Sequence, residues 1–198
     1  MLFVGLTGGL GSGKSEALAA CERLGAATLS SDAVVHELLG TQEVRDLLRD
    51  RWGDRVVSGE EVDRAAIASI VFERPEELAW LEGELFPRVG LRTAAWRAEL
   101  ERREPPPEIA VVEVPLLFEA GREGFFDATI AVVADEALRE ERAAARGHEG
   151  VAGREGRQLT QDEKAARADY VIRNDGPLAD LEDTVGAMLE QLRSRVTG

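Results

Sequence analysis

The segment Gly8–Ser15 constrains the fold of this chain more than any other stretch. It reads Gly-Gly-Leu-Gly-Ser-Gly-Lys-Ser and fits the phosphate-binding pattern G-x-x-x-x-G-K-[ST]. The apolar residues between Leu2 and Leu6 precede it as a short buried-strand candidate, and a helix-forming run from Lys14 to Ala20 follows it. This order of strand, loop and helix is that of a P-loop, and it predicts an α/β fold.

Each residue type in this segment suits the binding of a triphosphate. Glycines allow backbone angles that a side chain forbids, so that successive N–H groups can line a concave anion site. The N-terminus of the following helix adds partial positive charge. Lys14 would place its charge between the β- and γ-phosphates, and the Ser15 hydroxyl is the candidate Mg²⁺ ligand. The predicted nucleotide contacts are Gly9, Leu10, Gly11, Ser12, Gly13, Lys14 and Ser15.

The composition excludes several classes of function. A chain of 198 residues is long enough for one α/β domain. The formal net charge of -14 argues against nonspecific binding to nucleic acid or to an anionic membrane. Only two of the 24 basic residues are lysines, so a lysine at the P-loop position is informative in a chain that otherwise uses arginine. The single cysteine, Cys21, and the absence of a signal peptide or spanning segment indicate a cytoplasmic protein.

The rest of the chain predicts further strands and a helical insertion. The additional strand candidates are residues 26–31, 109–114, 129–134 and 170–173. Residues 41–103 are typical of helices, with Pro87 expected to break or kink one of them. This stretch is longer than a crossover between parallel strands requires, so we expect a helical insertion at about 60–104 that builds a second binding site. Its arginines Arg88, Arg92 and Arg97 form a solvated face from which one or two could reach an anionic substrate.

Two carboxylates outside the P-loop are candidate functional residues. Asp32 follows the second strand candidate, at the sheet edge where open α/β sheets bind ligands. It is either a catalytic residue or the N-cap of the helix that follows, and the sequence leaves both open. Glu113 interrupts an apolar strand. It belongs either to the surroundings of Mg²⁺ or to a strand end that faces solvent, and the second interpretation is slightly favoured.

A glycine-rich, arginine-bearing segment predicts a mobile lid at about 137–160. A helix over residues 137–146 is followed by residues 147–157, which contain too many glycines to hold a long helix. A plain surface loop is the alternative. The arginines of this region are Arg139, Arg142, Arg146, Arg154 and Arg157.

Several segments together resemble the bacterial dephospho-CoA kinases. They are Gly5–Ser15, Val114–Glu119, Gln158 with Lys164 six residues on, and Ala168–Gly176. Their order and spacing fit nearly the whole chain. The resemblance implies transfer of the γ-phosphoryl group of ATP, with Mg²⁺, to the 3′-hydroxyl of dephospho-CoA, the last step of CoA synthesis. It also implies a three-layer P-loop fold with a five-stranded parallel sheet, a helical acceptor-binding insertion and a lid.

The resemblance also implies roles for individual residues. Asp32 matches the general base of the family, Arg142 matches a lid-side arginine that contacts the ATP phosphates, and the segment from Asn174 to Gly176 would lie near the adenine. Two positions depart from the family pattern. Ser30-Ser31-Asp32 stands where Asp-Ala-Asp is usual, and Phe86-Pro87 stands where His-Pro is usual.

Two other functions fit the P-loop alone. One is a kinase for another small hydroxyl or nucleotide acceptor, and the other is a nucleotide-dependent regulatory switch. A GTPase would carry an Asn-Lys-x-Asp segment, which this sequence lacks. The expected partners are ATP and dephospho-CoA, without nucleic acid or membrane, and a monomer is favoured.

Overall fold

The structure, a computed structural model, describes residues 1–145 and 158–197. The chain divides into two compact units. The core unit comprises Met1–Ser30 and Arg97–Gly198, and the helical unit comprises Ser31–Trp96. The glycine-rich centre of the predicted lid, with Arg146, Arg154 and Arg157, lies outside the described residues.

A five-stranded parallel sheet forms the centre of the core unit, which confirms the predicted α/β class. Its strands lie in the order β2-β5-β1-β6-β7. Their bounds are β1 Leu2–Gly8, β2 Ala27–Ser30, β5 Ile109–Glu113, β6 Ala128–Val133 and β7 Tyr170–Arg173. The central strand β1 pairs with β5 through Leu6 and Glu113 and with β6 through Leu6 and Ile130. The P-loop therefore leaves the middle of the sheet at its carboxyl edge, where open α/β sheets bind their ligands.

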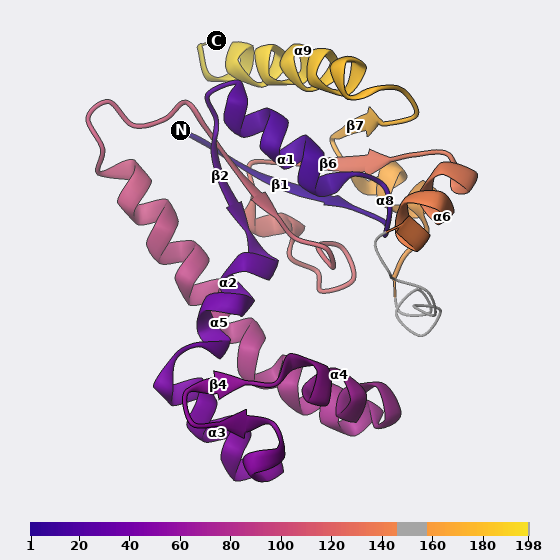
Figure 1. Ribbon diagram of the computed structural model, residues 1–198. Coiled ribbons are helices and arrows are strands. Elements are labelled where there is room, and N and C mark those ends of the chain that lie inside the picture. The colour runs from indigo at the N-terminus through magenta and orange to yellow at the C-terminus, as the bar shows by residue number, and fades with distance from the viewer. Residues whose placement is uncertain (146–157, 198) are drawn as a thin grey trace. The chain divides into compact units, whose positions relative to one another are not determined.

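Helices α1 (Lys14–Arg23) and α9 (Leu178–Thr197) cover one face of this sheet (Figure 1). The apolar stripe of α9 is buried there, and its members are Leu181, Val185, Met188, Leu189 and Leu192. Cys21 on α1 is also buried in this core. Burial raises the pKa of its thiol to about 12, because a thiolate is poorly solvated among apolar side chains.

The opposite face of β1 carries Phe3 and Thr7, because side chains alternate along a strand. The last residues of α5 (Pro75–Glu101) lie against it, with the Arg97 guanidinium 4.7 Å from the centre of the Phe3 ring. A short helix that the sequence did not predict, α8 (Gln161–Arg167), contacts β1 and β6. It begins with a capping box in which the Thr160 hydroxyl and the Glu163 carboxylate bind each other's backbone N–H groups. Helix α6 (Glu136–Ala145) follows β6.

The helical unit is built mainly of helices, as the sequence predicted. Its elements are α2 Ser31–Leu39, α3 Gln42–Trp52, η1 Gly53–Arg55, β3 Val57–Ser58, β4 Glu61–Val62, α4 Arg64–Glu73 and most of α5. The other short 3-10 helix, η2 Glu123–Phe125, belongs to the core unit. The small antiparallel hairpin β3–β4 was not predicted. Pro87 does not break the helix, as α5 continues on both sides of it. The buried residues Leu85 and Val89 anchor the helix on either side of the proline, so packing offsets the lost hydrogen bond.

Two of the α5 arginines that the sequence predicted to face solvent form ion pairs with glutamates of the helical unit. Arg88 binds Glu43 of α3 at 2.7 Å and Glu84 at 2.9 Å, and Arg92 binds Glu37 of α2 at 3.1 Å. The Arg88 guanidinium has its pKa raised, first by its hydrogen bond to Glu43. Over the described parts of the chain, no helix has the length and apolar character needed to cross a membrane.

Candidate phosphoryl-transfer site

The P-loop between β1 and α1 uses glycine where the backbone demands it. Gly11 has φ 72° and Gly13 has φ 89°, both in the left-handed region that side chains disfavour. A Cβ atom at Gly11 would overlap the backbone oxygen of Arg139, and one at Gly13 would overlap the side-chain amide of Asn174. These glycines therefore allow the loop both its curvature and its close approach to two other segments.

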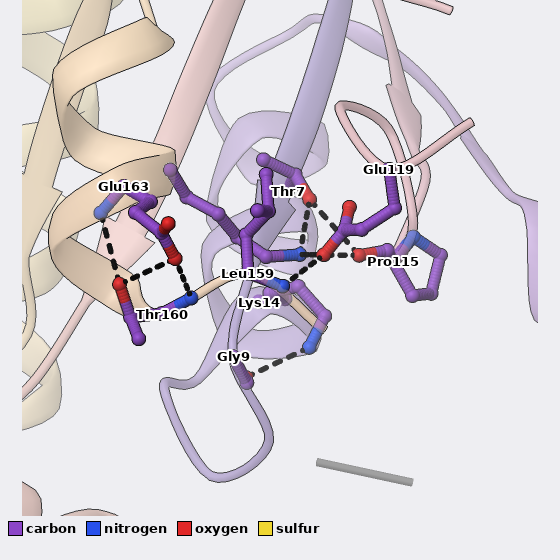
Figure 2. A network of polar contacts seen from close by, with 9 residues as sticks. Thr7, Gly9, Lys14, Pro115, Glu119, Leu159, Thr160 and Glu163 are labelled. Atoms are coloured by element: carbon purple, nitrogen blue, oxygen red, sulfur yellow. Dashed lines mark hydrogen bonds and ion pairs between the residues drawn. The ribbon is translucent and has the colours of Figure 1, made fainter. Parts of the chain in front are cut away.

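The side chains of the P-loop divide between the interior and the surface. Lys14 reaches back across the loop, and its Nζ donates to the Gly9 carbonyl at 3.0 Å (Figure 2). The Ser12 side chain is fully buried, and among the described residues its hydroxyl has no hydrogen-bond partner. Ser15 stands exposed in the first turn of α1. The loop thus presents Lys14 and Ser15 at the helix N-terminus, where the dipole favours an anion.

Helix α6 brings two arginines to this region. Arg139 donates from Nε to the Leu10 carbonyl at 2.8 Å and pairs with Glu136 at 2.7 Å, and its side chain is only 12% exposed. Arg142 donates to the Asn174 carbonyl at 3.0 Å. Arg142 was a predicted phosphate ligand and Arg139 had no predicted role of its own, although their spacing of three residues places both on one helix face.

Asn174 links the end of β7 to the P-loop. Its backbone N–H continues the sheet by donating to Val133 at 2.8 Å, and its side-chain Nδ2 donates to the Ser12 carbonyl at 2.9 Å. The side chain is buried, and it lies where a side chain at Gly13 would have to be. Gly176 lies two residues further on, in the turn between β7 and α9, beside the Asp180 carboxylate.

A pocket of about 390 Å³ opens beside the P-loop, within the size range of small-molecule sites. Gly9 and Arg139 line it together with the segment that leads into α8. Its lining residues are Gly9, Glu136, Arg139, Gln158, Leu159, Thr160, Gln161 and Asp162.

The two candidate carboxylates differ from the sequence-based expectations. Helix α2 begins at Ser31, so Asp32 is its second residue and not its N-cap. Its exposed carboxylate lies in the first turn, where the helix dipole favours negative charge. Glu113 does not face solvent, because only 4% of it is exposed. The reason is its place in the sheet, between Ser30 of β2 and Leu6 of β1.

Lys164 of α8 is a further residue of this region, and it had no predicted role. It is fully buried and pairs with Glu119 at 2.9 Å. Two features of the sequence pointed to it: its place six residues after Gln158 in the family pattern, and its rarity, since it and Lys14 are the two lysines of the chain.

The donor set near the P-loop is compatible with a Mg²⁺ ion that arrives with a nucleotide. The Ser15 hydroxyl is exposed at the start of α1. In residues 1–145 and 158–197, no group of three or more His, Cys, Asp or Glu side chains could hold a metal ion. Mg²⁺ in nucleotide sites takes one or two protein ligands and completes its shell with phosphates and water, so a full protein cage is not required.

A parallel sheet with its P-loop after the central strand, followed by cationic side chains at the same edge, defines a nucleotide-binding protein of the P-loop class. Within that class, the family model of dephospho-CoA kinase matches residues 2–180. The chain belongs to the dephospho-CoA kinase family, and its function is the ATP-dependent phosphorylation of dephospho-CoA in CoA biosynthesis.

Individual relatives agree with this assignment. A dephospho-CoA kinase of Deinococcus radiodurans is 38% identical over 96% of this chain and 91% of its own length. One of Thermus thermophilus is 36% identical over 100% of this chain and 95% of its own. A crystal structure from Thermus thermophilus, 36% identical, superimposes with a TM-score of 0.77 over 96% of this chain and 97% of that one. A dephospho-CoA kinase from Campylobacter jejuni, 22% identical with a TM-score of 0.71 over 97% of both chains, shares the fold.

Proposed function

We propose that this chain transfers the γ-phosphoryl group of ATP to the 3′-hydroxyl of dephospho-CoA, with the P-loop binding the phosphates and Asp32 accepting the hydroxyl proton. The observation that carries the proposal is the position of Lys14, whose ammonium lies 3.0 Å from the Gly9 carbonyl across a loop of N–H donors. Phosphoryl transfer is mainly a matter of positioning and charge neutralisation, and these groups provide both.

The phosphates of ATP are assigned to the P-loop, at Gly9 through Ser15. Backbone N–H groups and the α1 N-terminus bind the anion, and Lys14 neutralises charge on the β- and γ-phosphates. The Ser15 hydroxyl would hold a bound Mg²⁺, which supplies further neutralisation of the phosphate charge. Asn174 and Gly176 would lie near the adenine, and Arg142 would approach the phosphates from α6.

Asp32 is assigned to the acceptor. As the 3′-oxygen forms its bond to the γ-phosphorus, the bond from that phosphorus to the bridging oxygen breaks, and ADP leaves. The proton of the hydroxyl passes to the Asp32 carboxylate, since an alcohol is a weak nucleophile until a base accepts its proton. Ser30 stands where the family pattern has another acid, so this turn offers no second carboxylate as a substitute.

Arg142→Ala is expected to lower kcat by at least about tenfold while leaving the KM for dephospho-CoA within about twofold. The reason is that an arginine near the γ-phosphate neutralises charge that grows on the leaving oxygen. Steady-state kinetics with each substrate varied would measure this. Arg23→Ala, which removes an exposed arginine paired with Glu182 at 3.2 Å, is the matched control. A change in acceptor KM alone would place Arg142 in the acceptor site.

Dephospho-CoA alone is expected to slow amide hydrogen exchange within residues 60–104. This segment lies outside the strand-and-helix repeat that builds the P-loop, so it is the proposed acceptor-binding insertion. ATP alone should instead protect the P-loop and α1. Protection by dephospho-CoA confined to the P-loop would contradict the assignment.

The acceptor itself is tested by a coupled assay of ADP release across dephospho-CoA, nucleoside monophosphates and small sugars. Dephospho-CoA should be the preferred acceptor. A preference for another acceptor would indicate a different small-molecule kinase, and release independent of any acceptor would indicate a nucleotide-dependent switch.

The acidic charge and single buried cysteine support a cytoplasmic monomer that binds neither nucleic acid nor membrane.

A further inference from the structure

A buried ammonium group joins three segments at the base of the P-loop. The Nζ atom of Lys164 lies 2.9 Å from Glu119 Oε1 and 2.7 Å from the Pro115 carbonyl, with a longer contact of 3.5 Å to the Thr7 hydroxyl. The lysine side chain is 0% exposed and that of Glu119 is 12% exposed. Figure 2 shows Thr7, Pro115 and Glu119 converging on this point.

Each partner of Lys164 belongs to a segment that borders the phosphate site. Thr7 immediately precedes Gly8, and its hydroxyl also donates to the Pro115 carbonyl at 3.2 Å. Pro115 and Glu119 belong to the loop after β5. Glu119 Oε1 accepts a second hydrogen bond, at 2.8 Å, from the N–H of Leu159, which lines the pocket beside the P-loop. One ion pair therefore fixes the start of the P-loop, the loop after β5 and the segment before α8 relative to one another.

Stability alone does not account for this choice of residues. A buried ion pair loses hydration on both sides, and well-packed apolar residues are often as stabilising or more so. A lysine at this position is also unusual for this chain, because 22 of its 24 basic residues are arginine. A compact ammonium can direct three donors at acceptors on different sides, whereas a planar guanidinium is larger and directs its donors within one plane.

We propose that Lys164 is a positioning residue for phosphoryl transfer, which it serves by holding, together with Glu119, the entry of β1 into the P-loop. The proposal rests on the function proposed above. Lys164 touches no substrate in this scheme. It fixes Thr7, and with it the loop that carries the N–H donors and Lys14. Misplacement of a reacting group by about 1 Å can lower a rate about 10²-fold, so a small shift of this loop is sufficient for a large effect.

The test compares K164M, K164R and E119Q with the double variant K164M/E119Q. K164M should lower kcat about 10²-fold and weaken ADP binding about tenfold. It should also lower Tm, because the Glu119 charge remains buried without its cation, and in the described part of the chain its Oε2 already has no hydrogen-bond partner. The double variant removes both charges, so it should recover Tm without recovering kcat or ADP affinity. K164R should also lose turnover, since the site is shaped for an ammonium.

The matched control is T129V, at the amino end of β6. It removes the buried Thr129 hydroxyl, which exchanges hydrogen bonds with Asp169 at 2.9 and 3.1 Å, and it should lower Tm while kcat stays within about twofold. Recovery of kcat together with Tm in the double variant would reduce Lys164 to a structural residue and overturn the proposal. Wild-type turnover in K164R, or loss of turnover in T129V at equal Tm loss, would overturn it too.

Direct ADP titration separates this proposal from the proposed function. If the wild-type protein bound ADP but did not phosphorylate dephospho-CoA, the proposed function would fail, while the ADP affinities of the variants would still decide the role of Lys164. If K164M does not fold, the kcat and ADP affinity of the folded double variant decide whether Lys164 is a positioning or a structural residue.

Discussion

Lys14→Ala is expected to lower kcat by about 10²- to 10³-fold while the protein stays folded. The lysine supplies the only ammonium of the P-loop, and a charge aimed at the transferring phosphoryl group acts mainly in the transition state. We expect the variant to fold, because the Lys14 Nζ donates to the Gly9 carbonyl within its own loop. The coupled ADP assay measures the rate, and circular dichroism with thermal melting measures folding.

Two further variants sharpen this test. Lys14→Met keeps most of the apolar stem and removes only the charge, so it should be as inactive as the alanine variant. Arg23→Ala, at the other end of α1, should keep its activity because it removes an exposed charge far along the helix from the P-loop. A folded alanine variant with a near wild-type rate would end the assignment of the P-loop as the phosphate site.

Asp32→Asn is expected to lower kcat by roughly 10²-fold or more and to leave ATP affinity unchanged. The amide keeps the size of the side chain and removes its basicity, which is what the proton transfer requires. Because Asp32 is the second residue of α2, loss of its charge costs the helix no more than about 1 kcal/mol through the dipole. Tm, ATP affinity and turnover of the variant test these three expectations together.

Glu37→Gln is the matched control for Asp32. It removes another exposed carboxylate of the same helix, one that pairs with Arg92 at 3.1 Å, and should leave kcat within about twofold. Asp32→Ala should behave as Asp32→Asn in turnover, with a similarly small change in Tm. A fully active Asp32→Asn enzyme would exclude Asp32 as the general base.

The parts of the fold that were predicted are those with a strong local pattern. The P-loop combines fixed glycines with a strand before it and a helix after it, so its structure follows from nearby residues. The strands β5 and β6 are apolar apart from Glu113 and Thr129, as expected of central strands buried on both faces. The buried residues of α9 also recur at helical spacing, which is a local pattern of the same kind.

The parts that were not predicted depend on residues far apart in the chain. Helix α8 has only seven residues, and its buried side chain is a lysine whose partners lie on β1 and after β5, so no apolar period marks it. Glu113 resembles a strand-end carboxylate until its neighbours on both adjacent strands are known. Arg139 binds a carbonyl 129 positions away, and no spacing rule connects the two.

The burial of Cys21 has a practical consequence for spectroscopy. At neutral pH a thiol whose pKa lies near 12 is almost entirely protonated, and the neutral thiol is a poor nucleophile. Maleimide reagents would therefore leave Cys21 unmodified in the folded protein. Its replacement is not needed before a second cysteine is introduced for labelling. A single cysteine introduced at Leu91, whose side chain is largely exposed on α5, would give one defined attachment point for a fluorophore or spin label.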